Sequence, residues 1–121
     1  MNKLTKETNK KKVLDLVKRE SLFRTSLGNA KCWKKTTYEH FRVLSDILWK
    51  LGSQGYDVYS EVEFKNGGRA DLLVLDMNGN ASIIEILHSE TEERFEEKLS
   101  KYPFSVIKVR TKDFDIKKWD L

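Results

Sequence analysis

Apolar residues recur along this chain at two spacings, and the change of spacing predicts where helices give way to strands. Val13, Leu14 and Val17 begin a helical spacing that predicts a first helix over residues 11–23. Residues 24–35 are polar and basic and predict a loop.

A second helix is predicted from Thr36 to Leu51. Thr36 with Glu39 three residues later has the spacing of a capping box, in which each side chain satisfies a backbone N–H group at the helix start. Gly52 then supplies the end of the helix. The face predicted to be buried consists of Phe41, Leu44, Ile47, Leu48 and Leu51.

A third helix is predicted over residues 89–102. Ser89 and Glu92 form a second capping-box pattern, and Pro103 ends the helix. Its buried edge is predicted to consist of Phe95, Leu99 and Tyr102. The tail over residues 113–121 predicts a short helix that covers the core with Phe114, Ile116 and Trp119.

Four segments rich in β-branched, aromatic and other apolar residues predict strands: residues 56–64, 69–76, 81–88 and 105–110. Apolar side chains occupy both faces of the second and third strands, which therefore need a cover of helices on both sides. The element order is αβββαβ. The predicted fold class is α/β, with a mixed four-stranded sheet flanked by helices.

Composition narrows the class of protein. The 121 residues suffice for one domain, and 23 Lys or Arg against 19 Asp or Glu give a net charge of +4. The apolar runs fall far short of the ~20 residues of a membrane-spanning helix, so we predict a cytoplasmic protein with no membrane partner. Cys32 is the single cysteine, which excludes an intramolecular disulfide and a multi-cysteine zinc site.

The charge is unevenly distributed along the chain. Residues 1–35 hold eleven Lys or Arg and three acidic residues, a net charge of +8, whereas residues 36–121 have a net charge of −4. We therefore divide the chain into a basic N-terminal extension of helix and loop, residues 1–35, and a core domain, residues 36–121. A basic arm on an acidic body is typical of proteins that approach phosphate groups; an arm that serves solubility alone is the alternative.

Two acidic residues interrupt the most apolar segments of the chain. Asp71 begins the second strand, and Glu85 lies inside the third. A buried charge is costly unless a partner or a metal offsets it, and carboxylate oxygens suit Mg²⁺ or Mn²⁺. The alternatives are a strand-start cap at Asp71 and, for Glu85, an edge position or an ion pair with Arg69 or a basic residue of the next helix.

The hairpin between the second and third strands decides whether the two carboxylates share a face. A two-residue turn would put Asp71 and Glu85 on opposite faces, because side chains alternate along a strand. A three-residue loop, over residues 77–79 or 78–80, would return both to one face. We therefore predict a loop of odd length, with Gly79 or an Asn at positive φ.

Four short segments fall in a recognisable order: Thr37-Tyr38-Glu39-His40, Gly55-Tyr56-Asp57-Val58 with Glu61, Gly68-Arg69-Ala70-Asp71-Leu72-Leu73, and Ile84-Glu85-Ile86. In this order the chain resembles the PD-(D/E)XK nuclease superfamily, and within it looks most like the competence-protein type of nuclease domain. The resemblance covers about residues 36–110. It implies a restriction-endonuclease-like core.

The resemblance also implies an activity, which is Mg²⁺- or Mn²⁺-dependent hydrolysis of phosphodiester bonds in DNA. Asp71 and Glu85 would bind the metal with help from the Ile86 carbonyl, and Glu39 would reach the site from the helix before the first strand. Bound metal would activate a water and stabilise charge on the scissile phosphate. The alternative for Glu39 is a role limited to closing the capping box.

One position departs from the family pattern. Leu87 stands two residues after Glu85, where the pattern has a lysine that orients the attacking water. Lys98, on one helical face with Arg94 and Lys101, is the predicted substitute, unless that face is only a solvated row of charges. Loss of catalysis with retention of the fold gives a second hypothesis, a nuclease-fold protein that binds DNA without cutting it.

Sequence-independent contacts to the DNA backbone are predicted for Lys31, Lys34, Lys35 and Arg69. Trp33 is either a packing residue or a residue that stacks on a base. A homodimer is compatible with the resemblance, since a duplex has two strands to cut. A third hypothesis is a protein-interaction module whose basic arm recognises an acidic partner.

The remaining residues with catalytic chemistry are not assigned to the site. His40 and His88 are isolated and lack metal-ligand spacing, so both are predicted to be structural. Cys32 has no histidine near it in the sequence, so nucleophilic catalysis by its thiol is not expected.

Overall fold

A mixed four-stranded sheet organises the part of the chain that the computed structural model describes, which is residues 3–18, 37–87 and 92–121, with only the backbone placed at residues 92–94, 98 and 113. The predicted α/β class is confirmed. In chain order the elements are α1 (Lys3–Leu14), α2 (Tyr38–Ser53), β1 (Asp57–Glu63), β2 (Arg69–Leu75), β3 (Ala81–Leu87), α3 (Glu92–Leu99), β4 (Ser105–Arg110) and the 3₁₀ turn η2 (Thr111–Asp113).

The strands lie in the order β1-β2-β3-β4, and β1, β2 and β3 are successive antiparallel neighbours. The fourth strand is parallel to β3, so the chain crosses from β3 to β4 through α3. All four strands begin and end within about one residue of their predicted bounds. The runs of β-branched and apolar residues in the sequence were sufficient to locate these strands.

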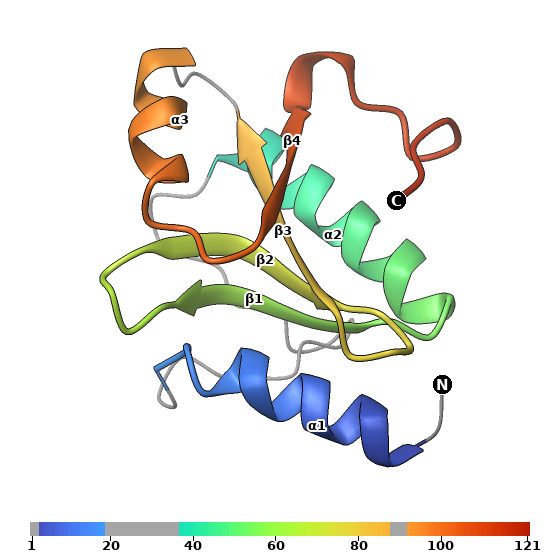
Figure 1. Cartoon of the computed structure of the whole chain (residues 1–121). Coiled ribbons are helices and arrows are strands. Elements are labelled where there is room, and N and C mark those ends of the chain that lie inside the picture. Colours follow the sequence, from blue (N-terminus) through green and yellow to red (C-terminus); the bar gives the residue numbers. More distant parts are fainter. Residues whose placement is uncertain (1–2, 19–36, 88–91) are drawn as a thin grey trace.

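Helices lie on both sides of the sheet, as strands with apolar side chains on both faces require (Figure 1). One face packs against α2 in an apolar cluster built around Leu44, Ile47, Leu72 and Ile84. The other face carries a second cluster in which side chains of the α1 segment meet the sheet; its members include Val13, Val17, Tyr59, Leu73 and Ile83.

The first helix is earlier in the chain than predicted. It spans Lys3–Leu14 instead of residues 11–23, and Val17 forms an isolated β-bridge with Phe64, which an uninterrupted helix would not permit. Polar contacts also hold α1, since Lys10 Nζ lies 3.3 Å from Asp57 Oδ2. The basic extension therefore begins with a helix that packs on the sheet. Residues 19–36 lie outside the described part of the chain.

The start of α2 is one residue later than predicted. The N-cap is Thr37, whose Oγ1 accepts a hydrogen bond from the His40 backbone N–H at 3.1 Å, so the predicted capping box of Thr36 and Glu39 does not open this helix. Phe41, predicted to be buried, is 39% exposed. The buried stripe instead consists of Val43, Leu44, Ile47, Leu48 and Leu51.

The C-terminal elements are shorter than predicted. The third helix ends at Leu99 and not at Tyr102. The predicted tail helix does not form: residues 114–121 contain only a turn, in which the N–H groups of Lys118 and Trp119 donate to the Asp115 carbonyl. Phe114 and Trp119 nevertheless pack against the α2 side of the core, as predicted for the tail. Within the described residues, no helix combines the length and apolar character needed to cross a membrane.

Candidate active site

Asp71 and Glu85 lie opposite each other across the β2–β3 hairpin. The register pairs Leu72 with Ile84 and Leu73 with Ile83, and its continuation by one position brings Asp71 to Glu85. The prediction that both carboxyl groups share one face of the hairpin is thus confirmed.

The loop of the hairpin explains this register. The Asp76 N–H donates to the Asn80 carbonyl at 2.9 Å, which encloses a loop of odd length over residues 77–79. Gly79 has φ +81°, the left-handed conformation predicted at this loop.

The Asp71 carboxylate is held by three neighbours. Oδ2 accepts a hydrogen bond from the Ile86 N–H at 2.8 Å, Oδ1 lies 3.4 Å from Nε2 of His40, and the carboxyl group is also hydrogen-bonded to Glu85. Burial by itself raises the pKa of Asp71. The pKa is nevertheless below its ordinary value of 3.8, because the effect of burial is outweighed by hydrogen bonds with His40 and Glu85, the charge of His40 and the hydrogen bond from the Ile86 N–H.

Glu85 is 2% exposed inside the most apolar strand of the sheet. Its Oε1 accepts a hydrogen bond from the Tyr102 hydroxyl, which also lies 2.7 Å from the Arg69 carbonyl oxygen. The ion pair that the structure shows for the Arg69 guanidinium joins it to Glu61 at 3.0 Å. A tyrosine hydroxyl therefore contacts the Glu85 carboxyl oxygen.

The contact between Asp71 and Glu85 has a chemical requirement. Two carboxyl groups in hydrogen-bonding contact share a proton, so that one of them is neutral, unless a cation lies between them and allows both to be ionised. Among the residues at 3–18, 37–87 and 92–121, no group of three or more His, Cys, Asp or Glu side chains has a metal-binding arrangement. Two carboxylates nevertheless fit Mg²⁺, which is commonly bound by one or two carboxylates and keeps several of its waters.

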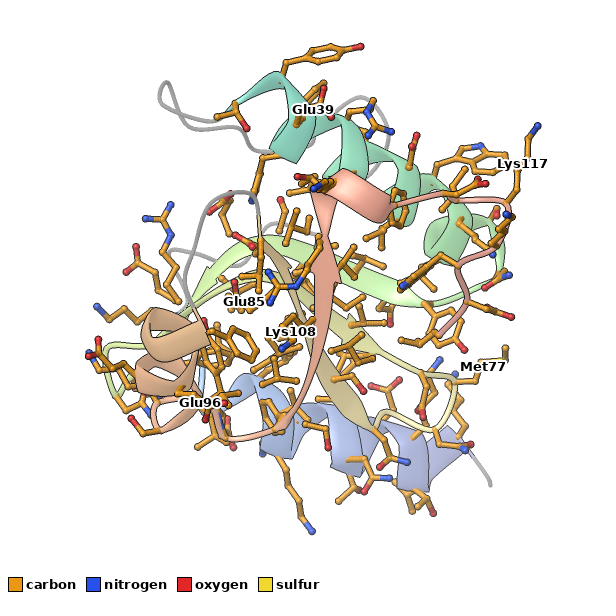
Figure 2. The ribbon with its side chains drawn as sticks, turned by 90° about the horizontal axis from the view of Figure 1, so that it is seen from above. Glu39, Met77, Glu85, Glu96, Lys108 and Lys117 are labelled. Carbon is orange, nitrogen blue, oxygen red and sulfur yellow. The ribbon has the colours of Figure 1, made fainter. Side chains whose placement is uncertain are left out.

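Glu39 lies away from these two acids. Its carboxylate is 3.2 Å from the Arg42 guanidinium and its side chain is 47% exposed. Figure 2 shows it on the outer side of the first turn of α2, well separated from Glu85. The structure brings His40, the next residue, to Asp71 instead.

Lys108 is a cation beside Glu85 that the sequence did not indicate. The parallel register of β3 and β4 pairs Glu85 with Lys108, and Figure 2 shows the two residues next to each other. Lys108 Nζ lies 5.1 Å from the centre of the Phe95 ring on α3. Leu87, which stands at the lysine position of the family pattern, is 2% exposed. The side chain of Lys98 lies outside the described part.

The residues predicted to contact DNA are only partly described. Lys31, Lys34 and Lys35 lie in the undescribed segment over residues 19–36. Arg69 is described, and its side chain is 42% exposed while it pairs with the buried Glu61. This guanidinium therefore keeps one side open to solvent.

Three residues of the site were missed in the sequence, for different reasons. His40 precedes Leu44 by four residues and Ile47 by seven, so helical periodicity alone places it on the buried face of α2. No comparable local signal exists for Tyr102 or Lys108, because each meets Glu85 only through the return of the chain after α3.

The site residues come from four elements and the segment before β4. The α2 helix supplies His40, β2 supplies Asp71, β3 supplies Glu85, β4 supplies Lys108, and Tyr102 follows α3.

Searches against protein-family models, curated proteins and solved structures found no match to this chain.

Proposed function

We propose that this protein is a metal-dependent nuclease that hydrolyses phosphodiester bonds in DNA. The observation that carries the proposal is the contact between the carboxyl groups of Asp71 and Glu85 across two neighbouring strands. One of the two, Glu85, is buried in an apolar strand, where an acidic residue is costly without a compensating function. Perturbed and buried titratable groups of this kind are concentrated at functional sites.

The two acids would hold one Mg²⁺ or Mn²⁺ ion, and the neighbouring residues would orient them. When bound, the ion would lower the pKa of a coordinated water and neutralise charge on the scissile phosphate. His40 keeps Asp71 ionised and fixes one of its oxygens, while Tyr102 fixes one oxygen of Glu85. Lys108 adds a positive charge on the same face of the sheet as Glu85 and would substitute for the family lysine.

The order of the elements supports the same proposal. From α2 to β4 the chain follows the αβββαβ order that the resemblance to PD-(D/E)XK nucleases implies, with the two acids on the second and third strands. The proposal includes the assignment of the fold to the restriction-endonuclease-like class. It also includes DNA as the partner of the basic extension, and a homodimer on duplex substrates.

A second candidate function is a nuclease-fold protein that binds DNA without cutting it. It is favoured by Leu87, and by the protein donors that already occupy the acids: the Ile86 N–H and His40 on Asp71, and the Tyr102 hydroxyl on Glu85. A carboxyl pair so fully bonded is stable without a metal.

Cleavage of a labelled DNA by the purified protein, with Mg²⁺, Mn²⁺ or EDTA, separates the two candidates. We expect metal-dependent cleavage that is lost in Asp71→Ala and Glu85→Gln, with melting temperatures that show folded protein. Glu63→Gln, which changes an acid at the end of β1 that pairs with Lys18, is the matched control and should cut normally. Metal-independent binding with no cleavage by any variant would support the second candidate, and equal cleavage by all variants would contradict both.

A further inference from the structure

Glu61 is a buried acid in a backbone conformation that side chains rarely adopt. It is 6% exposed, and its φ of +53° is the only positive value among the described residues other than glycine. A side chain in this left-handed conformation is strained, because its Cβ comes too close to the backbone. Strained residues and buried acids are both concentrated at functional sites. Glu61 is therefore a candidate for a role beyond the packing of the sheet.

The position of Glu61 on β1 faces the carboxylate pair. Val62 pairs with Ala70 in the register of β1 and β2. One position back along β1 and one forward along β2, Glu61 faces Asp71. Because Asp71 in turn faces Glu85, three neighbouring strands each have an acid at the matching position.

The Glu61 carboxylate holds the guanidinium of Arg69. Nη2 of Arg69 lies 3.0 Å from Oε2 of Glu61. The residue directly opposite Arg69 in the register is Glu63, whose carboxylate lies 3.5 Å from Lys18 Nζ. The guanidinium thus reaches diagonally across the strands to Glu61, the acid whose position faces Asp71.

The backbone of Arg69 is fixed close to the carboxylate pair. The Tyr102 hydroxyl lies 2.7 Å from the Arg69 carbonyl oxygen and also contacts the Glu85 carboxyl group. Arg69 precedes Asp71 by two residues on β2, a separation of about 7 Å along a strand. Arg69 is therefore held at its carbonyl by Tyr102 and at its guanidinium by Glu61, within a side chain's length of the two acids.

The two partners differ in their exposure. The Arg69 side chain is 42% exposed, whereas that of Glu61 is 6% exposed. A guanidinium carries five N–H donors in a planar fork, so it can bind a carboxylate along one edge and a phosphate along another. A guanidinium that is already held in place loses less conformational entropy when it binds. The buried acid is placed to act as a support, and the exposed cation as the contact.

We propose that Glu61 is a positioning residue that holds the Arg69 guanidinium against a DNA phosphate at the carboxylate pair. This inference rests on the proposed nuclease function, because it takes the phosphate to belong to a DNA strand at that site. The alternative is a purely structural ion pair, in which Arg69 neutralises the buried Glu61 and neither residue affects binding.

The two explanations predict opposite effects of Glu61→Gln, which removes a negative charge and keeps the shape of the side chain. If the pair is only structural, the variant repels DNA less, and its affinity should rise or stay the same. If Glu61 positions Arg69, the affinity should fall although the protein has become more positive. We expect a fall of about three- to tenfold for a short labelled DNA duplex, measured by fluorescence anisotropy in EDTA with the full chain.

A second substitution shows whether Glu61 acts through Arg69. Arg69→Gln should weaken binding about tenfold and reduce the slope of log affinity against log salt concentration by about one, as expected for the loss of one phosphate contact. Added to Arg69→Gln, Glu61→Gln should cause no further weakening, because the cation that it positions is absent.

Two further variants complete the test. Glu63→Gln removes the same charge two positions along β1, from an acid that pairs with Lys18, and should leave the affinity unchanged or raise it. Glu61→Gly removes the carboxylate together with the strain, because glycine adopts positive φ readily. It should weaken binding as Glu61→Gln does, and it provides the test if the melting temperature shows that Glu61→Gln does not fold.

Several results would overturn the inference. Unchanged or tighter binding by folded Glu61→Gln or Glu61→Gly would assign the ion pair to structure alone. An equal fall in Glu63→Gln, or a further fall when Glu61→Gln is added to Arg69→Gln, would show that Glu61 does not act through Arg69.

The assay needs neither metal nor cleavage, so its outcome is separate from that of the proposed function. A wild-type protein that binds DNA and leaves it uncut in Mg²⁺ would contradict the nuclease but not the role of Glu61. A wild-type protein that does not bind DNA would contradict both.

Discussion

Nε2 of His40 lies 3.4 Å from Oδ1 of Asp71, so α2 reaches the carboxylate of β2 through a histidine and not through the adjacent glutamate. The same carboxylate accepts the Ile86 N–H on its other oxygen. Asp71 is therefore clamped from a helix on one side and from a neighbouring strand on the other. The two contacts fix where any cation or proton shared with Glu85 can sit.

The first prediction concerns the acid stability of the fold. Because the pKa of Asp71 is lowered in the folded protein, ionised Asp71 stabilises the fold above its unfolded pKa, and this contribution is lost as the pH falls through the folded pKa. The difference in free energy of unfolding between wild type and Asp71→Asn should shrink as the pH falls below about 4. Urea denaturation at each pH measures it.

A second variant links that pH dependence to His40. The hydrogen bond with His40 is the strongest contribution that lowers the pKa of Asp71, so His40→Gln should move the loss of stability to higher pH. An unchanged pH range in His40→Gln would assign the effect to Glu85 and Ile86 alone.

A third prediction tests the cation beside Glu85. If Lys108 substitutes for the family lysine, Lys108→Met should lower the rate of DNA cleavage about 10- to 100-fold, because a positive charge near the reacting phosphate is lost. Lys98→Met is the comparison, as the substitute expected from the sequence. The variant with the larger fall in single-turnover rate at saturating DNA identifies the lysine, and equal small effects would exclude both.

Tyr102 should be important for stability as well as for the site. Tyr102→Phe removes the hydroxyl that contacts both Glu85 and the Arg69 carbonyl, and leaves two polar groups short of a partner. We expect a loss of about 1–2 kcal/mol in the free energy of unfolding. Tyr38→Phe removes a hydroxyl from a side chain on a residue that is 74% exposed and should change stability little.

Gly79 provides a stability test of how α1 docks. A Cβ at Gly79 would lie 2.6 Å from the Lys6 carbonyl oxygen and would also be strained by φ +81°, so Gly79→Ala should destabilise the fold and loosen α1. Gly67 has φ +94°, and a Cβ added there would meet nothing within 4 Å, so Gly67→Ala measures the cost of the conformation alone, about 1 kcal/mol. The excess cost of Gly79→Ala over Gly67→Ala, in thermal or urea unfolding, reports the contact with α1.

The strands and their register could be predicted from the sequence because both depend on neighbours in the chain. Alternation along β2 and β3 showed that a loop of odd length puts Asp71 and Glu85 on one face, but it left two such loops open, residues 77–79 and 78–80. The structure has the first, which places Asp71 opposite Glu85.

The start of α2 was harder, because Thr36 and Thr37 are both good capping residues. The cap does not decide which residue reaches the site: Glu39 was assigned to it by the resemblance, whereas the helical spacing from Leu44 and Ile47 places His40 on the buried face.

The rest of the site depends on contacts between distant segments. Tyr102 and Lys108 reach Glu85 only after the chain has crossed from β3 to β4 through α3, and no spacing in the sequence records that geometry. The C-terminal tail is likewise held because Lys50 of α2 donates hydrogen bonds to carbonyl oxygens of residues more than sixty positions later. Local patterns cannot specify such pairings.

The three-residue loop that joins β2 to β3 has a consequence for how this protein can change over evolutionary time. Asp71 and Glu85 are held opposite each other by the pairing of two buried strands and not by the loop itself, because a longer loop can be closed by the same last pair of residues. Residues added between Asp76 and Asn80 should therefore leave the carboxyl pair intact, whereas a single residue added within either strand, between its acid and the loop, would turn that acid to the far side of the sheet.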